Sequence, residues 1–132
     1  MTSRPLDMLD VLDSLPCYFS VLDQQLHFLL TNQAFKNDFG SDGIGKLCHV
    51  IYKNSSFHCD PCPVLKTFDD GEIHFSEETI QLKNGEICQV FVQTAPLKET
   101  QGNVVAVIEL LTNITVIKKS QKELSILGHS IA

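Results

Sequence analysis

The chain has 132 residues, enough for one domain with a modest core, and its 43% hydrophobic and 20% charged residues are typical of a soluble globular protein. Its formal net charge of −6 argues against a nucleic-acid partner, because such a partner requires a basic face. The longest apolar stretch, residues 104–111, is interrupted by Glu109 and is far shorter than the ~20 residues of a membrane-spanning helix. The N-terminus lacks the apolar core of a secretory signal. We therefore expect a cytoplasmic protein without direct membrane insertion.

The N-terminal segment predicts a short helix followed by a hairpin. Residues 6–15 place apolar side chains on one helix face, and Pro16 ends that helix. Residues 17–22 and 26–31 have the composition of strands, and the polar turn between them predicts that the two strands pair.

Several short helices are expected in the centre of the chain. Asn32 is a suitable N-cap for a helix over residues 33–39. A second helix is expected over 46–52. A third, with Pro63 in its first turn, is expected to run to about residue 68 and to end at Asp69-Asp70-Gly71.

The second half of the chain is rich in strand signals. Strands are expected over residues 73–82, 87–98 and 104–112, and Asn84-Gly85 predicts a tight hairpin between the first two. A last helix begins near Thr115. Because strands stand at both ends with helices between them, the pattern indicates an α+β fold with an antiparallel sheet.

Four local features of this chain resemble those of the PAS family. They are the strand-to-helix junction Thr31-Asn32-Gln33-Ala34-Phe35, the Gly71 turn, the Asn84-Gly85 hairpin, and Leu111-Thr112-Asn113-Ile114-Thr115. The last resembles the Asp-Ile-Thr motif at which the family's signal leaves the domain, with Asn113 in place of Asp. Asn caps a helix start as well as Asp does, but it cannot form the salt bridge that Asp makes in some members.

The resemblance implies a five-stranded antiparallel sheet with short helices over one face, flanked by N- and C-terminal helices. It implies a linker helix over residues 1–16, a PAS domain over 17–115 with Asn113 and Thr115 at the signal exit, and a signalling helix over 116–132. Members of the family can enclose a small ligand, haem or flavin, and many form dimers. Fold alone therefore names no ligand.

Three cysteines, at positions 48, 59 and 62, form a C-x10-C-x2-C pattern followed by Pro63. A C-x2-C pair can direct two thiolates at one metal. Pro63 would place Cys62 near a helix N-cap, where the helix dipole favours a thiolate. The pattern resembles a Cys-rich subgroup of PAS domains in bacterial sensor histidine kinases.

Three interpretations of this cluster remain open: a structural role, a metal or iron–sulfur site, and a reversible thiol switch. A tetrahedral metal site would need a fourth donor, for which His49, His58, His74 and Cys88 are candidates. Cys17 and Cys88 lie in strand patterns and are expected to pack in the core.

Aromatic side chains are the candidates for lining a ligand pocket, although most are expected to be simple core. These candidates are Phe19, Phe35, Phe39, Phe68, Phe75 and Phe91. His49 and His58 fall where a haem ligand would be expected, but a surface position is more common for such residues. Residues 32–39 contain no Cys, so a flavin photosensor is excluded.

The C-terminal segment resembles the linker that leads into the dimerisation helix of sensor histidine kinases. Ile117, Leu124 and Ile131 recur every seven residues, as in a coiled coil. We therefore expect a sensory input domain of a bacterial two-component histidine kinase, forming a homodimer and acting with the kinase domains and a response regulator. The alternative is a structural dimerisation module that senses nothing. No catalytic motif is present, so an enzyme is not expected in this fragment, although its parent would be a kinase.

Overall fold

The computed structural model describes residues 5–57 and 60–131, and its centre is one five-stranded antiparallel sheet in the order β2-β1-β5-β4-β3. The strands are β1 (Tyr18–Leu22), β2 (Phe28–Thr31), β3 (His74–Gln81), β4 (Ile87–Lys98) and β5 (Val104–Asn113). The helices are α1 (Met8–Asp13), α2 (Gln33–Phe39), α3 (Cys48–Lys53), α4 (Pro63–Asp70) and α5 (Thr115–Ile131). The predicted fold class is confirmed, and most predicted element boundaries agree within two residues.

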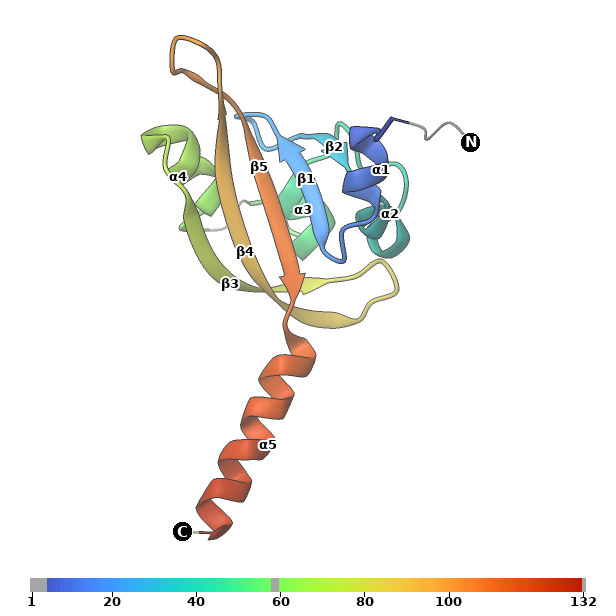
Figure 1. Cartoon of the computed structure of the whole chain (residues 1–132), viewed down its shortest axis with the longest axis vertical. Coiled ribbons are helices and arrows are strands. Elements are labelled where there is room, and N and C mark those ends of the chain that lie inside the picture. Colours follow the sequence, from blue (N-terminus) through green and yellow to red (C-terminus); the bar gives the residue numbers. More distant parts are fainter. Residues whose placement is uncertain (1–4, 58–59, 132) are drawn as a thin grey trace.

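Helices α2, α3 and α4 cover one face of the sheet, which we call the inner face (Figure 1). Strand residues alternate between the two faces, so every second residue of β4 from Cys88 to Thr94 is buried beneath these helices. Helix α1 lies beside α2, and α5 extends away from the lower end of β5.

Asn32 fixes the junction between β2 and α2, as its predicted role as an N-cap requires. Its Oδ1 accepts hydrogen bonds from the backbone N–H groups of Phe19 and Phe35. Its Nδ2 donates to the carbonyl oxygens of Leu12 and Cys17. One buried side chain therefore joins the end of α1, the start of β1 and the first turn of α2.

An aromatic cluster fills the core beneath α2 and α3. The ring centroid of Phe35 lies 4.9 Å from that of Phe28, 5.0 Å from that of Phe39 and 5.8 Å from that of Tyr52. Such ring pairs add to the stability that area burial alone gives. This cluster anchors the two short helices, neither of which would be stable alone.

Helix α4 begins and ends as its sequence predicts. Cys62 is the N-cap residue, Pro63 is the first helical residue, and Gly71 follows the last residue in the left-handed conformation (φ 68°) that glycine adopts without strain. In the middle of the helix, the Thr67 and Thr94 hydroxyl oxygens lie 2.7 Å apart in a buried hydrogen bond. This bond fixes α4 to the centre of β4.

The connection between β5 and α5 is held to β4 by hydrogen bonds. Asn113 Oδ1 accepts from the N–H of Thr115 at 3.0 Å, and Thr115 Oγ1 accepts from the N–H of Gln89 at 2.9 Å. The Lys118 ammonium lies 2.9 Å from the Glu77 carboxylate of β3. The first turn of α5 is therefore tied to the sheet, while the rest of the helix projects away from it (Figure 1). In the part of the chain that is described, no helix has both the length and the apolarity needed to cross a bilayer.

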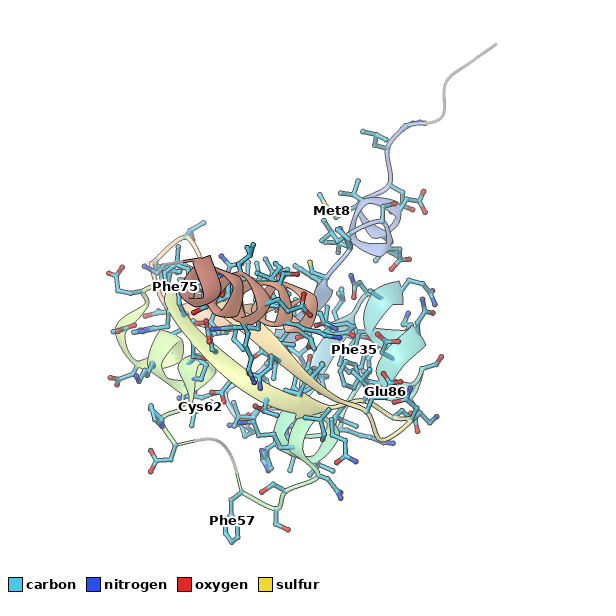
Figure 2. All side chains as sticks on the ribbon, turned by 90° about the horizontal axis from the view of Figure 1, so that it is seen from below. Met8, Phe35, Phe57, Cys62, Phe75 and Glu86 are labelled. Carbon is cyan, nitrogen blue, oxygen red and sulfur yellow. The ribbon has the colours of Figure 1, made fainter. Side chains whose placement is uncertain are left out.

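The outer face of the sheet carries exposed apolar side chains. Phe75 and Phe91 stack there with centroids 5.8 Å apart and planes 13° from parallel, and Phe75 is 59% exposed. Helix α1 has no buried residue, and its Met8 stands away from the body of the domain (Figure 2). A surface of this kind is typical of contacts with another chain.

Candidate ligand-binding site

A cavity of about 30 Å³ lies between the inner face of the sheet and helices α3 and α4, within a pocket whose empty space, mouth included, is about 400 Å³. A cavity of this size holds about one or two water molecules. Its lining residues are Cys48, His49, Tyr52, Lys53, Cys62, Pro63, Val64, Glu78, Ile80, Val92, Glu109 and Leu111. The site thus draws on three strands and two helices that are distant in sequence.

A row of polar residues crosses the inner face of the sheet beside this cavity. In strand order, the register places Thr31, Ser20, Glu109, Thr94 and His74 opposite one another. The rows on either side are mostly apolar, as expected for a buried sheet face. Glu109 occupies the middle of this row, on the central strand β5.

Glu109 is the only residue of the row that brings a carboxyl group into the core. It is 6% exposed, and its Oε1 has no hydrogen-bond partner among the residues that the structure describes. Burial raises the pKa of this carboxyl to about 8, and the nearby Glu78 carboxylate adds to the rise. The carboxyl is therefore protonated in most molecules at neutral pH.

Four further buried polar atoms lack a hydrogen-bond partner within the described residues: Ser20 Oγ, Tyr52 Oη, His49 Nδ1 and Ser76 Oγ. Of these residues, Tyr52 and His49 line the cavity. Burial, followed by the charge of Glu109, raises the pKa of Tyr52 well above its usual value. The nearby Ser20 hydroxyl opposes that rise without reaching hydrogen-bond geometry. Buried polar atoms are normally paired, so this group indicates space for a bound molecule or ordered water.

The mouth of the pocket is formed by an ion pair. Lys53 Nζ of α3 lies 2.8 Å from Glu78 Oε2 of β3, and both side chains are half-buried. This pair connects α3 to the edge strand and places opposite charges where the cavity meets solvent. It contributes more to positioning than to stability, because partly exposed ion pairs are individually weak.

Two of the three clustered cysteines line the cavity. Cys48 begins α3, Cys62 precedes α4, and both are buried together with His49. Cys59 and His58 lie outside the described residues. Within residues 5–57 and 60–131, no group of three or more His, Cys, Asp or Glu side chains is arranged to hold a metal ion.

The other donors considered for a metal lie elsewhere. His74 Nε2 is 2.7 Å from Asp70 Oδ2 at the end of α4, and neither residue lines the cavity. Cys88 is buried on β4, and burial raises the pKa of its thiol. Cys17 is only half-buried, just before β1.

None of the six candidate phenylalanines lines this cavity. Phe35 and Phe39 belong to the aromatic cluster beneath α2, and Phe68 packs at the edge of the core. Phe19, Phe75 and Phe91 point to the outer face, and Figure 2 shows Phe75 and Cys62 on opposite sides of the sheet.

Sequence analysis did not select Glu109, Tyr52 or Ser20 as site residues. Glu109 had one visible signal, because it stands at an inner-face position of an otherwise apolar strand, in phase with Val107 and Leu111. No local sequence pattern marks Ser20 or Tyr52 as a site residue. Their importance follows from a strand register and a helix position that only the folded chain defines.

An antiparallel sheet of this order, with helices and a small pocket over one face and a helix leaving its central strand, defines a PAS-type sensory domain. The sequence profile described as PAS fold matches residues 12–118. The chain therefore belongs to the PAS family. No curated protein matches the chain in sequence.

Solved structures share the fold at low sequence identity. The PAS domain of a Colwellia psychrerythraea protein is 16% identical, with a TM-score of 0.69 over 80% of this chain and 92% of that one. The PAS domain of Bordetella pertussis BvgS is 22% identical, with a TM-score of 0.59 over 92% and 95% of the two chains. The Vibrio cholerae VqmA dimer in the absence of its target DNA, described in connection with LuxR-type receptors, is 16% identical, with a TM-score of 0.71 over 87% of this chain. This chain spans 53% of the VqmA chain.

Proposed function

We propose that this PAS domain is the sensory input module of a bacterial histidine kinase, that it binds a small ligand in the cavity beside Glu109, and that α5 carries the signal out. The observation that supports ligand binding is a group of three buried polar atoms without partners among the described residues, Glu109 Oε1, Tyr52 Oη and His49 Nδ1, whose residues all line one cavity. Each such atom costs about 1–3 kcal/mol when it is left unsatisfied. A ligand that pairs with them recovers that energy.

The proposed output depends on the exit from β5. Glu109 and Asn113 lie on the same strand, and Asn113 caps the first turn of α5 through Thr115. A ligand that shifts β5 relative to β4 would therefore strain the hydrogen bond that the N–H of Gln89 donates to Thr115 Oγ1 and the one that the N–H of Ile114 donates to the Gln89 carbonyl oxygen. These contacts support the proposed signal-exit role of Asn113 and Thr115.

Filling the cavity is expected to abolish ligand binding. Val64 is fully buried on α4 and lines the cavity, so Val64→Leu adds one methylene at its wall. We expect native mass spectrometry of freshly purified protein to show a bound mass that disappears on denaturation. The affinity for the ligand should fall at least about tenfold in the variant, which corresponds to about 1.4 kcal/mol of binding free energy, and the bound mass should decrease accordingly.

Val50→Leu is the matched control, since Val50 is an exposed helical valine on α3 outside the cavity. It should leave the bound mass unchanged. If the native mass per subunit of the wild type equals its denatured mass, no ligand is bound. That result would favour the non-sensing dimerisation module instead.

The kinase context is testable from the gene. In the intact gene, the codons that follow position 132 are expected to encode a dimerisation helix that contains the phosphoacceptor histidine. A kinase domain is expected after that helix. VqmA is a structural neighbour that binds a target DNA. A DNA-binding domain in place of the kinase would therefore contradict the kinase proposal but not ligand binding.

Dimer formation is part of the same proposal. The exposed Phe75 and Phe91 stack, the apolar side chains of α1 and the similarity to the VqmA dimer support a homodimer that uses the outer face. In a kinase, this interface would hold the two α5 helices in register for the kinase domains and their response regulator.

A further inference from the structure

The charges around the cavity discriminate between classes of ligand. Glu109 and Glu78 line it, and the one cationic side chain among the described lining residues, Lys53, is already engaged by Glu78. If Glu109 is ionised, these three groups sum to one negative charge. An anionic ligand would favour the neutral form of Glu109 and would place its charge near the Glu78 carboxylate, whose neighbouring cation Lys53 is already engaged.

The position of Glu109 indicates what a bound molecule must supply. Glu109 lines the cavity, the residue is only 6% exposed, and its Oε1 is buried without a partner among the described residues. A carboxylate oxygen accepts hydrogen bonds, and an N–H donor that carries positive charge forms the strongest of these. The Tyr52 ring lines the same cavity, and aromatic rings also attract cations.

The remaining unpaired groups suit a short polar molecule. The Tyr52 hydroxyl can donate or accept a hydrogen bond, and His49 Nδ1 supplies one further position, since both residues line the cavity. Val64, Val92 and Leu111 form the apolar part of the wall. A ligand with one ammonium group, a short carbon link and one hydroxyl satisfies the carboxyl and one of its polar neighbours.

We propose that the cavity binds a small protonated amine, whose ammonium group donates to the Glu109 carboxylate and whose other polar group pairs with the Tyr52 hydroxyl. This inference rests on the proposed sensory function and names its ligand class. Binding converts the Glu109 carboxylic acid into its carboxylate, and the proton leaves to solvent. Because burial holds the pKa of this carboxyl near 8, most molecules release one proton on binding at neutral pH.

Three probes of similar size and different charge test the inference: ethanolamine, ethylene glycol and glycolate. Each is added to the full chain at neutral pH and matched ionic strength, and the midpoint of thermal unfolding is measured. At roughly ten times its Kd, ethanolamine is expected to raise the midpoint by about 2–5 °C. The neutral and anionic probes should change it by less than about 1 °C at the same concentration.

Glu109→Gln should remove the ethanolamine shift, because an amide carries no charge to pair with the ammonium group. Glu86→Gln is the matched control, since Glu86 is exposed at the β3–β4 turn, far from the cavity (Figure 2). A second measurement uses the unaltered chain: calorimetric titration with ethanolamine in two buffers of different ionisation enthalpy should report the release of roughly half to one proton per site near pH 7.

The outcomes separate this inference from the sensory proposal. Equal or larger shifts with glycolate or ethylene glycol would overturn the amine class and leave ligand binding intact. No shift with any of the three probes, or binding without proton release, would also overturn it. In that case, the bound mass and its sensitivity to Val64→Leu still decide whether the cavity binds a ligand.

Discussion

Replacing Glu109 with glutamine will remove a pH dependence of stability of about 3 kcal/mol between about pH 5 and about pH 8. The carboxyl has a pKa of about 8 in the folded chain, against an ordinary value of 4.5. Between these values the folded chain holds a proton that the unfolded chain has released. Stability is therefore greatest below the lower value and is lost as the pH rises through the folded pKa.

Urea unfolding of the wild type and of Glu109→Gln at several pH values measures this effect. The other titratable side chains recorded close to Glu109 are Glu78, which is paired with Lys53, and Tyr52. They are unchanged in the variant, so the difference between the two curves isolates position 109. The variant should gain stability relative to the wild type as the pH rises. Parallel curves would show that Glu109 is not held protonated, whereas Glu86→Gln should follow the wild type throughout.

Phe35→Ala is expected to destabilise the domain by about 3–5 kcal/mol. Phe35 is fully buried, and it contacts the rings of Phe28, Phe39 and Tyr52. Truncation leaves a cavity at the centre of this cluster, and α2 and α3 lose their shared anchor. Many small domains have a total stability of only about 5–15 kcal/mol, so the variant should unfold at markedly lower urea concentration.

Phe57→Ala provides the comparison. Phe57 is 81% exposed and projects away from the domain (Figure 2), so its truncation should change stability by less than about 0.5 kcal/mol. Phe35→Leu keeps most of the buried volume and should fall between the two. A loss below about 1 kcal/mol in Phe35→Ala would show that position 35 tolerates empty space and would reopen its role as a pocket residue.

The sequence predicted the fold well because its signals are local. Asn32 caps a helix, Pro63 begins one, and Asn84-Gly85 turns a hairpin, and each of these acts through its own neighbours in the chain. Strand alternation then placed Cys88 in the core, where the structure finds it. Local rules of this kind hold wherever they agree with the tertiary structure.

The residues that line the cavity could be predicted only in part, because the geometry of the cavity is not local: Cys48, Cys62 and His49 were selected from the sequence, whereas Glu109 and Tyr52 were not. The phenylalanines were chosen for residue type, but the choice between core, pocket and outer face depends on strand register and helix placement. Phe75 and Phe91 illustrate this, since both lie on strands but face away from the cavity. Glu109 meets Ser20 only because β5 pairs with β1, across some ninety positions of sequence. Such closeness between residues that are distant in sequence cannot be deduced from their spacing along one chain.

The strand order also determines at which point in synthesis the five-stranded sheet can be completed. The β1–β2 hairpin and the β3–β4 hairpin share no strand pairing, and β5 alone joins them by pairing with β1 on one side and β4 on the other. During synthesis, the β1–β2 and β3–β4 hairpins can therefore join into one sheet only after β5 has been made. Pairings between such distant segments are slow to form, and until then both hairpins present open edges to other chains.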